Sequence, residues 1–181
     1  GGKSFYTAIK MKNTGEIFSF DIHGNKLSLI ESGAEHLGIS IIKTEERDAR
    51  FPREDLYGSF DRVLCDVPCS GLGVIRRKPE IRFKDPAELA TLPKIQYKIA
   101  STTAKYLKTG GTMIYSTCTL SKEENEQVVK RLMEEDGLVP ADKDAFTIFR
   151  YDDNNISAGV AYKGTYKTVS LGFPIETLRT Q

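Results

Sequence analysis

The sequence alternates short β-like runs with helical runs, and this alternation constrains the fold more than any other feature. The β-like runs, rich in aromatic and β-branched residues, cover residues 16–21, 39–43, 60–66 and 112–117. Between and after them, helical spacing of apolar residues covers residues 4–12, 27–37, 93–108 and 121–136. This order predicts an α/β fold with a mostly parallel sheet and helices on both faces.

Local signals set the expected helix boundaries. Leu27, Ile30, Ala34 and Leu37 fall on one helix face that we expect to be buried, and Gly38 follows as the C′ residue. Asp85 followed by Pro86 indicates a helix N-terminus. In the helix expected at 93–108, Ile95, Ile99, Tyr106 and Leu107 form the buried side, and Gly110 and Gly111 end the helix. Ser121 and Glu124 form a capping box at the start of the last helix, which ends before Gly137. From about residue 141 the runs are β-like without helical period, which predicts an antiparallel edge with loops.

Composition excludes several classes of protein. The 181 residues fit one domain, 1–181, and 26 basic against 25 acidic residues give a net charge of +1, so affinity for nucleic acid requires a local patch. Three cysteines without framework spacing favour a reducing compartment over a disulfide scaffold. With two histidines far from them we expect no metal site, and no apolar run reaches the ~20 residues of a membrane span.

Polar residues stand at the carboxyl ends of the expected strands. Asp21 ends the run at 16–21, Asp48 follows the next, Asp66 ends the run at 60–66 with Cys69 on the turn after it, and Cys118 ends the run at 112–117. Ligands of doubly wound sheets bind at this edge. We therefore expect these side chains to line one rim.

Two segments are candidates for a nucleoside-cofactor site. Gly1, Gly2 and Lys3 precede a helix and lie 18 to 20 residues before Asp21, an acid that would accept from ribose hydroxyls. Remnants of an expression tag would also explain the two glycines. Asp48 could accept from an adenine amino group, or it is a solvated carboxylate in the run EERDAR. The sequence has no G-x-G-x-x-G, which disfavours a nicotinamide cofactor.

The two turn cysteines suggest addition chemistry on a pyrimidine ring. A thiolate that adds to cytosine C6 makes C5 nucleophilic toward a methyl sulfonium, and a base must then remove the C5 proton. Cys118 and Cys69 supply the thiols, and Asp66 supplies a carboxyl group that would assist at N3 if burial kept it protonated. Cys118 precedes a helix whose N-terminus would lower its pKa, whereas Cys65, inside a strand, is expected in the core.

A basic segment follows the first cysteine turn. It comprises Arg76, Arg77, Lys78, Arg82 and Lys84. Such residues at the rim of a site hold phosphates, although a solvated loop has the same composition.

These motifs resemble those of the Sun-type RNA cytosine-C5 methyltransferases, which include bacterial small-subunit rRNA methyltransferase B and the nucleolar Nop–Sun proteins. The stretch DVPCSGLGVIRRKPEIRF, residues 66–83, resembles the family's motif IV, and GGTMIYSTCTLSKEENEQVV, residues 110–129, resembles motif VI with the helix after it. GGKS resembles the end of motif I, and Asp21 and Asp48 stand at the motif II and III acids. The resemblance covers about residues 1–136.

The resemblance implies a Rossmann-like fold with S-adenosylmethionine as methyl donor. It implies that Gly1, Gly2 and Lys3 line the methionine end, Asp21 holds the ribose, Asp48 meets the adenine, and Asp66 lies between cofactor and cytosine. The resemblance also implies that Cys118 is the nucleophile and that Cys69 takes part in the release of the product. DNA cytosine-C5 methyltransferases use the Pro-Cys thiol instead, so the presence of both cysteines fits the RNA enzymes better.

The resemblance also implies a partner and a location. The substrate would be rRNA, or tRNA, bound in part by Arg76, Arg77 and Lys78, with no membrane and no metal involved. The protein would be cytoplasmic if bacterial and nucleolar if eukaryotic. The chain begins inside motif I, without the family's first strand, and ends before its last one, so we expect a fragment that binds cofactor weakly or not at all.

Two other functions compete with this one. An amino-methyltransferase has Asp-Pro-Pro-aromatic at motif IV, where this chain has Cys69 and no aromatic residue directly after it. Activity that survives Cys118→Ala would favour that class. A catalytically inactive binding module of an RNA-processing complex would bind RNA without methyl transfer.

Overall fold

The computed structural model describes residues 1–140, 146–150, 157–163 and 167–171. The chain forms two compact units, Gly1–Phe51 and Pro52–Gln181. In the described helices, no stretch is long and apolar enough to cross a membrane.

The first unit is a βαβ unit preceded by a helix. Helix α1 (Gly2–Lys10) leads to β1 (Ile17–Asp21), α2 (Gly24–His36) and β2 (Ile42–Glu46). Strands β1 and β2 are parallel, and Ile17 pairs with Ile42 at one end and Asp21 with Glu46 at the other. The predicted helix at 4–12 therefore begins and ends two residues earlier than expected.

The buried face of α2 is shorter than predicted. Leu27, Ile30 and Ala34 are buried as expected, but Leu37 is 55% exposed. The helix ends at His36, so Leu37 no longer follows the helical period. Gly38 has φ +65°, as expected of a C′ glycine. The Ile39 N–H still bonds the Ala34 carbonyl at 2.8 Å, and for this reason β2 starts only at Ile42 instead of residue 39.

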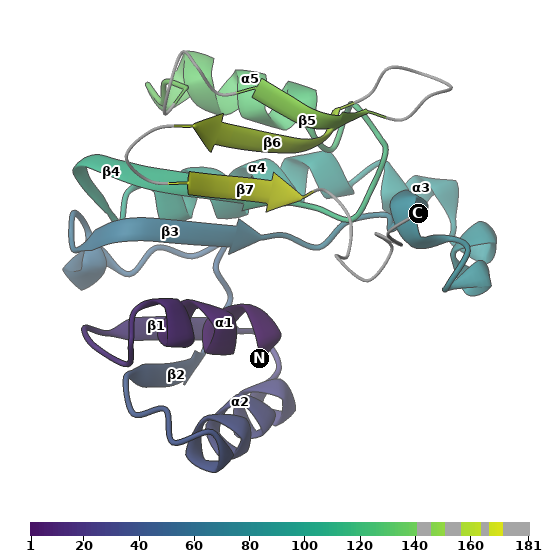
Figure 1. The fold of residues 1–181 in the computed structure, drawn as a ribbon. Helices are drawn as coiled ribbons and strands as arrows, with labels where there is room; N and C mark the ends of the chain where they lie inside the picture. The colour runs from purple at the N-terminus through teal and green to yellow at the C-terminus, as the bar shows by residue number, and fades with distance from the viewer. Residues whose placement is uncertain (141–145, 151–156, 164–166, 172–181) are drawn as a thin grey trace. The chain divides into compact units, whose positions relative to one another are not determined.

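The second unit is built on another parallel pair, β3 (Phe60–Asp66) and β4 (Leu107–Ser116). Figure 1 shows α3 (Pro86–Leu89) and α4 (Leu92–Ala104) on the connection between them, and α5 (Glu126–Glu135) follows β4. Short 3₁₀ helices are η1 (Glu54–Leu56), η2 (Leu72–Val74) and η3 (Pro79–Phe83). Asp85 caps α3 as predicted, since its carboxylate accepts from the Ala87 N–H at 2.8 Å.

Gly110 and Gly111 do not stop a helix, as we had expected, but lie inside β4. Helix α4 already ends at Ala104, and Tyr106 and Leu107 lie beyond it. The strand register shifts between Phe60 and Arg62, so the glycine pair occupies an irregularity of the ladder. Gly110 has φ +79°, and a Cβ on Gly111 would lie 2.9 Å from the Lys108 carbonyl oxygen. A side chain at either position would therefore distort this bend.

The core of the second unit lies between this pair of strands and two helices. Its buried members are Cys65, Val67, Ala100, Val128 and Leu132. The run at 60–66 is less buried than predicted, because Leu64 is 46% exposed and Cys65 alone in the strand is fully buried.

Three further strands confirm the predicted antiparallel C-terminal part. They are β5 (Phe146–Arg150), β6 (Ser157–Lys163) and β7 (Lys167–Leu171), in the order β5-β6-β7. The α/β class with parallel strands is also confirmed. In the described residues the parallel ladders are β1–β2 and β3–β4, each within its own unit.

The buried core predicts different losses of stability for substitutions at two positions of α5. Leu132 is 3% exposed in α5, whereas Val129, three residues earlier, is 39% exposed. We expect Leu132→Ala to lower the free energy of unfolding by about 2–5 kcal/mol, since it removes buried methyl groups and leaves a cavity. Val129→Ala should cost less than about 1 kcal/mol. Urea unfolding followed by circular dichroism measures both, and equal losses would contradict the placement of this core.

Candidate active site

The two cysteine turns meet because β3 and β4 are parallel neighbours. Asp66 pairs with Ser116 at the ends of these strands, and the Val67 N–H donates to the Ser116 carbonyl at 3.2 Å. Past the strands, the Gly73 N–H donates to the Cys118 carbonyl at 3.0 Å. The loops that follow the two strands therefore run side by side, as predicted for carboxyl ends of parallel strands.

Glycines permit the close approach of the two loops. A Cβ on Gly73 would lie 2.9 Å from the Cys118 carbonyl oxygen, closer than side-chain carbons are found. Gly71 has φ +81°, a conformation that favours glycine. This backbone geometry accounts for the glycines in the stretch CSGLG.

The approach of the loops brings two thiols into direct contact. Cys69 and Cys118 are free, their Sγ atoms lie 2.7 Å apart, and both side chains are partly buried. The Cys118 N–H also donates to the Cys69 sulfur at 3.2 Å. Cys65 lies in the core as predicted, where burial raises its pKa to about 11.

The contact makes the two thiols chemically different. The hydrogen bond between the Cys69 and Cys118 thiols is the largest effect on Cys118 and lowers its pKa to about 7. Partial burial and the charge of Asp66 oppose this shift, and the positive charge of Lys78 adds to it. The same hydrogen bond raises the pKa of Cys69. The directions of these two shifts favour Cys118 as the thiolate of the pair and Cys69 as its proton donor.

The direction of the Cys118 shift was predicted, but its cause was not. We expected the N-terminus of the following helix to lower this pKa. Helix α5 begins only at Glu126, after the N-cap residue Asn125, so that helix end is eight residues along the chain from Cys118. A neighbouring thiol, which the sequence places 49 residues away, has the larger effect.

Asp66 lies beside the thiols but is exposed. It occupies the last position of β3, and its charge is close enough to raise the pKa of Cys118. Asp66 is exposed because side chains alternate along the strand and Cys65 takes the inward position.

A buried hydrogen-bond network joins the two loops, and sequence reasoning missed it. The Glu124 carboxylate accepts from the Ser70 N–H at 2.9 Å and from Gln96 Nε2 at 2.8 Å. The Ser70 and Thr119 hydroxyls bond each other at 2.6 Å. Gln96, fully buried, shares the inner face of α4 with Ala100. Gln96 lies on the buried face of a predicted helix, and a buried amide needs a polar partner, so this residue was the signal in the sequence that could have indicated the network.

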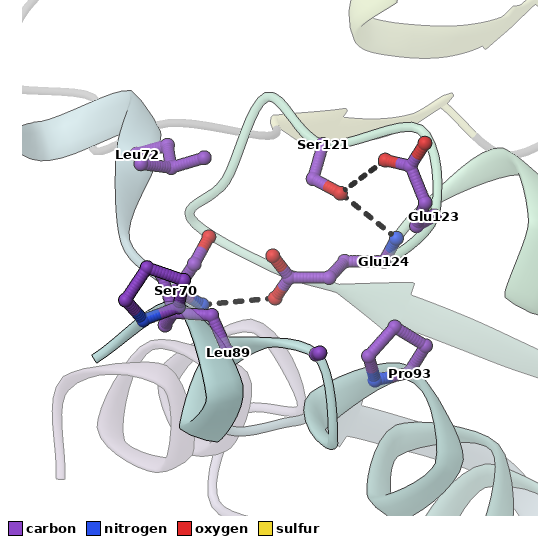
Figure 2. Close-up of a pocket in the computed structure, with 9 residues that line it drawn as sticks. Ser70, Leu72, Leu89, Pro93, Ser121, Glu123 and Glu124 are labelled. Atoms are coloured by element: carbon purple, nitrogen blue, oxygen red, sulfur yellow. Dashed lines mark hydrogen bonds between the residues drawn. The ribbon is translucent and has the colours of Figure 1, made fainter. Parts of the chain in front are cut away.

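The predicted capping box is therefore only half formed. Ser121 Oγ accepts from the Glu124 N–H at 3.3 Å, as a box requires, and Figure 2 shows both this bond and the bond from Ser70. The Glu124 side chain, however, turns inward to Ser70 instead of returning to the Ser121 backbone. The Ser121 hydroxyl donates to Glu123, the exposed neighbour, at 2.7 Å.

A pocket of about 360 Å³ adjoins this network. Figure 2 shows the residues that line it, which are Ser70, Leu72, Pro86, Leu89, Ala90, Pro93, Ser121, Glu123 and Glu124. Its walls are mainly apolar, with the polar groups supplied by the two loops. Neither cysteine is among the lining residues.

The basic segment begins directly beyond the first cysteine loop. Arg76, Arg77 and Lys78 are exposed on the turn after η2, and Arg82 is exposed in η3. Lys84 Nζ donates to the Ser70 carbonyl at 3.2 Å. The segment therefore adjoins the thiols, with Lys78 near enough to influence Cys118.

The predicted cofactor residues lie in the first unit. Gly1 is the N-cap of α1, and Gly2 and Lys3 form its first turn, in which the Ser4 hydroxyl bonds Ser19 of β1 at 2.8 Å. Asp21 ends β1, where its carboxylate accepts from the His23 N–H at 2.9 Å and pairs with Lys26 at 3.3 Å.

Asp48 lies at the same edge of the β1–β2 pair as Asp21. It follows β2, and the Arg47 N–H donates to the Asp21 carbonyl at 2.8 Å. Hydrogen bonds from Arg50, with Nη2 at 2.6 Å, hold the pKa of Asp48 below its usual range. A cofactor amino group would share this carboxylate with Arg50. Among the described residues, no three His, Cys, Asp or Glu side chains group as metal ligands would.

The thiol pair predicts a pH profile for alkylation. Iodoacetamide reacts with thiolates, so we expect Cys118 to be modified with a midpoint near pH 7, while Cys69 stays slow because its pKa is raised. Cys69→Ala removes the hydrogen bond that lowers the Cys118 pKa most. The midpoint should then rise toward the ordinary value of about 8.5. Peptide mass spectrometry gives the rates, with buried Cys65 as internal control, and an unchanged midpoint would contradict this coupling.

Comparison with known proteins identifies relatives of this chain. A probable ribosomal RNA small subunit methyltransferase B of Bacillus subtilis is 45% identical over 137 residues, which are 75% of this chain and 31% of the relative. A human 28S rRNA (cytosine(4447)-C(5))-methyltransferase is 36% identical over 83% of this chain and 20% of its own length. The chain thus spans less than a third of either relative.

A solved structure and a family model give the same result. The structure of NSun6 from Pyrococcus horikoshii with SFG matches with a TM-score of 0.62 at 32% identity, over 75% of this chain and 34% of that one. The family model described as 16S rRNA methyltransferase RsmB/F matches residues 1–160. The chain therefore belongs to the RsmB/F family of rRNA methyltransferases, with the Rossmann-like α/β fold of that family.

Proposed function

We propose that this chain is the catalytic domain of an RNA cytosine-C5 methyltransferase that uses S-adenosylmethionine to methylate rRNA. The observation that carries the proposal is the thiol pair, in which the sulfur atoms of Cys69 and Cys118 lie 2.7 Å apart and their hydrogen bond lowers the pKa of Cys118 to about 7. A cytosine-C5 methyltransferase needs a thiolate to activate the ring and a separate group for release. The relatives' names, which specify rRNA and cytosine C5, support this choice of substrate.

The thiols take successive roles. The Cys118 thiolate adds to cytosine C6, and the electron pair of the C5–C6 double bond moves so that C5 becomes nucleophilic. After C5 has gained the methyl group, a base must take the C5 proton, the double bond re-forms, and the bond from C6 to the Cys118 sulfur breaks. Cys69, protonated beforehand and next to the leaving sulfur, is placed to assist this release.

Asp66 is placed to bind the target base. It ends β3 beside the thiols and is exposed, so a cytosine held against Cys118 can reach its carboxyl group. In the proposed mechanism this carboxyl group donates a hydrogen bond to N3 of the base.

Residues of the first unit fit the cofactor. S-adenosylmethionine supplies an electrophilic methyl group when bound. The carboxylates of Asp21 and Asp48 lie at the carboxyl edge of a parallel pair, where nucleosides bind, and both are acceptors suited to ribose hydroxyls and an adenine amino group. Gly1, Gly2 and Lys3 open α1, whose N-terminal N–H groups suit the methionine carboxylate. The NSun6 structure was solved with SFG, an analogue of this cofactor, which supports the assignment.

The basic segment is the proposed RNA contact. Arg76, Arg77 and Lys78 are exposed directly after the Cys69 loop, where phosphates on either side of the target cytosine would lie. The RNA that they contact would be rRNA, in the cytoplasm or, in a eukaryote, in the nucleolus.

Covalent trapping tests the proposed function. The full-length gene product is mixed with S-adenosylmethionine and rRNA that contains 5-fluorocytidine, and the mass of the protein is measured. Fluorine at C5 blocks proton removal, so the bond between Cys118 and C6 should persist. We expect an adduct with the unaltered protein and with Cys69→Ala, and none with Cys118→Ala.

The other outcomes discriminate between functions. An adduct lost only in Cys69→Ala would assign the nucleophile to the Pro-Cys turn, as in the DNA enzymes. Methyl transfer that survives Cys118→Ala would indicate an amino-methyltransferase. RNA binding without any adduct would indicate a binding module.

Salt dependence tests the RNA contact separately. Neutralising Arg76, Arg77 and Lys78 together should weaken binding of single-stranded RNA and reduce the slope of log K against log salt by about 2, at about 0.7 per lost phosphate contact. Lys130→Ala, which removes an exposed charge from α5, is the control and should leave the slope unchanged. Fluorescence anisotropy at several salt concentrations measures both, and an unaltered slope in the triple variant would exclude this segment from the interface.

A further inference from the structure

Glu124 is a buried carboxylate to which the proposed mechanism gives no role. It is 3% exposed, although glutamate is almost never fully buried without partners. Desolvation of a carboxylate is costly unless hydrogen bonds compensate for it. Its contacts therefore indicate what the buried charge holds in place.

On one side, the carboxylate holds both neighbours of Cys69. Its Oε2 atom accepts from the Ser70 N–H at 2.9 Å and from Gln96 Nε2 at 2.8 Å. Gln96 Nε2 also donates to the Pro68 carbonyl at 2.8 Å. The backbone before and after Cys69 is thus tied to one carboxylate and one amide.

On the other side, Glu124 reaches the residue after Cys118. The Thr119 hydroxyl lies 3.4 Å from Oε1 and 2.6 Å from the Ser70 hydroxyl. The backbone of Glu124 is itself fixed, because its carbonyl accepts from the Tyr115 hydroxyl of β4 at 2.7 Å. One side chain therefore joins the Cys69 loop to the Cys118 loop.

Helix capping does not explain this arrangement. The bond from the Glu124 N–H to Ser121 Oγ uses the backbone and is available to any residue at this position. Glu123 carries the same charge at the neighbouring position, and its contact is with the exposed Ser121 hydroxyl. Figure 2 shows the contrast, with Glu124 directed to Ser70 and Glu123 directed to Ser121.

We propose that Glu124 is a positioning residue that holds Cys69 against Cys118 through Ser70, Gln96 and Thr119. Without its carboxylate, the Ser70 N–H loses its buried acceptor and the Cys69 loop loses its link to the turn before α5. The thiols then separate. The consequence for methyl transfer rests on the proposed function, whereas the consequence for thiol geometry does not.

The first readout is disulfide formation, which depends on thiol proximity alone. Dilute peroxide takes one hydrogen from each thiol and is reduced to water as the bond between the sulfurs forms. We expect the unaltered full-length gene product to form the Cys69–Cys118 disulfide rapidly, as seen by peptide mass spectrometry. In Glu124→Ala this rate should fall by about tenfold or more, because a shift of about 1 Å strongly affects reacting groups.

The second readout is the rate of adduct formation with 5-fluorocytidine RNA. In Glu124→Ala it should fall at pH 7 on the order of tenfold, about as much as in Cys69→Ala, because Cys118 loses the hydrogen bond that lowers its pKa. Glu124→Asp, whose carboxylate is one methylene shorter, should behave like Glu124→Ala. Glu124→Gln keeps an acceptor for Ser70 and presents its NH₂ group to the Thr119 hydroxyl, so its rate should lie between those of Glu124→Ala and the unaltered protein.

Two controls separate positioning from general destabilisation. Glu123→Ala removes the neighbouring carboxylate and should leave both rates unchanged. Val128→Ala weakens the core of α5, so its melting temperature falls while the thiol rates should persist. If Glu124→Ala does not fold, Thr119→Val replaces it, since this variant removes the hydroxyl between the loops with little change in shape.

The outcomes are distinct. Unchanged disulfide and adduct rates in the folded Glu124 variants, or losses that Val128→Ala reproduces, would overturn the positioning role. In a further outcome, the disulfide forms rapidly only while Glu124 is present, but the protein gives no adduct with RNA. This outcome would support the positioning role of Glu124 and overturn the proposed function.

Discussion

The parallel pairing of β3 with β4 is the constraint on which the site depends. The ladder sets Asp66 opposite Ser116, so the two loops leave the sheet at the same edge although 49 residues separate their cysteines. An antiparallel pairing would place the loops at opposite ends of the strands. Connecting parallel strands requires a crossover, and α4 supplies it together with the inner-facing Gln96.

Contact between the thiols then gives each a different chemistry. A lone cysteine in this half-buried position would be disfavoured as a thiolate, because partial burial and the charge of Asp66 both raise the pKa of Cys118. The hydrogen bond between the two thiols outweighs them. The two cysteines therefore titrate as a unit, and replacement of either one changes the pKa of the other.

The buried carboxylate of Glu124, at the point where the two cysteine loops meet, fits the need for a fixed distance between the two sulfur atoms. The thiol hydrogen bond depends on geometry, and loops are ordinarily the most mobile part of a fold. Here the Cys69 loop is held by Glu124 and Gln96, and its glycines allow the Cys118 carbonyl to approach closely. The candidate catalytic thiols thus lie on loops, which Gln96 of helix α4 and Glu124 in the turn before α5 hold in place.

The sequence by itself determined the α/β class, the parallel strands and the antiparallel end, and it singled out the two candidate catalytic cysteines, because hydrophobic periodicity and turn residues are local signals. It misplaced what depends on neighbours distant in the chain. Gly110 and Gly111 proved to be a strand irregularity, Leu37 is exposed, Asp66 is not buried, and the Cys118 pKa is lowered by a thiol in place of a helix. The inward turn of Glu124 could be decided only by the tertiary structure, since its acceptor role arises where three separate segments meet.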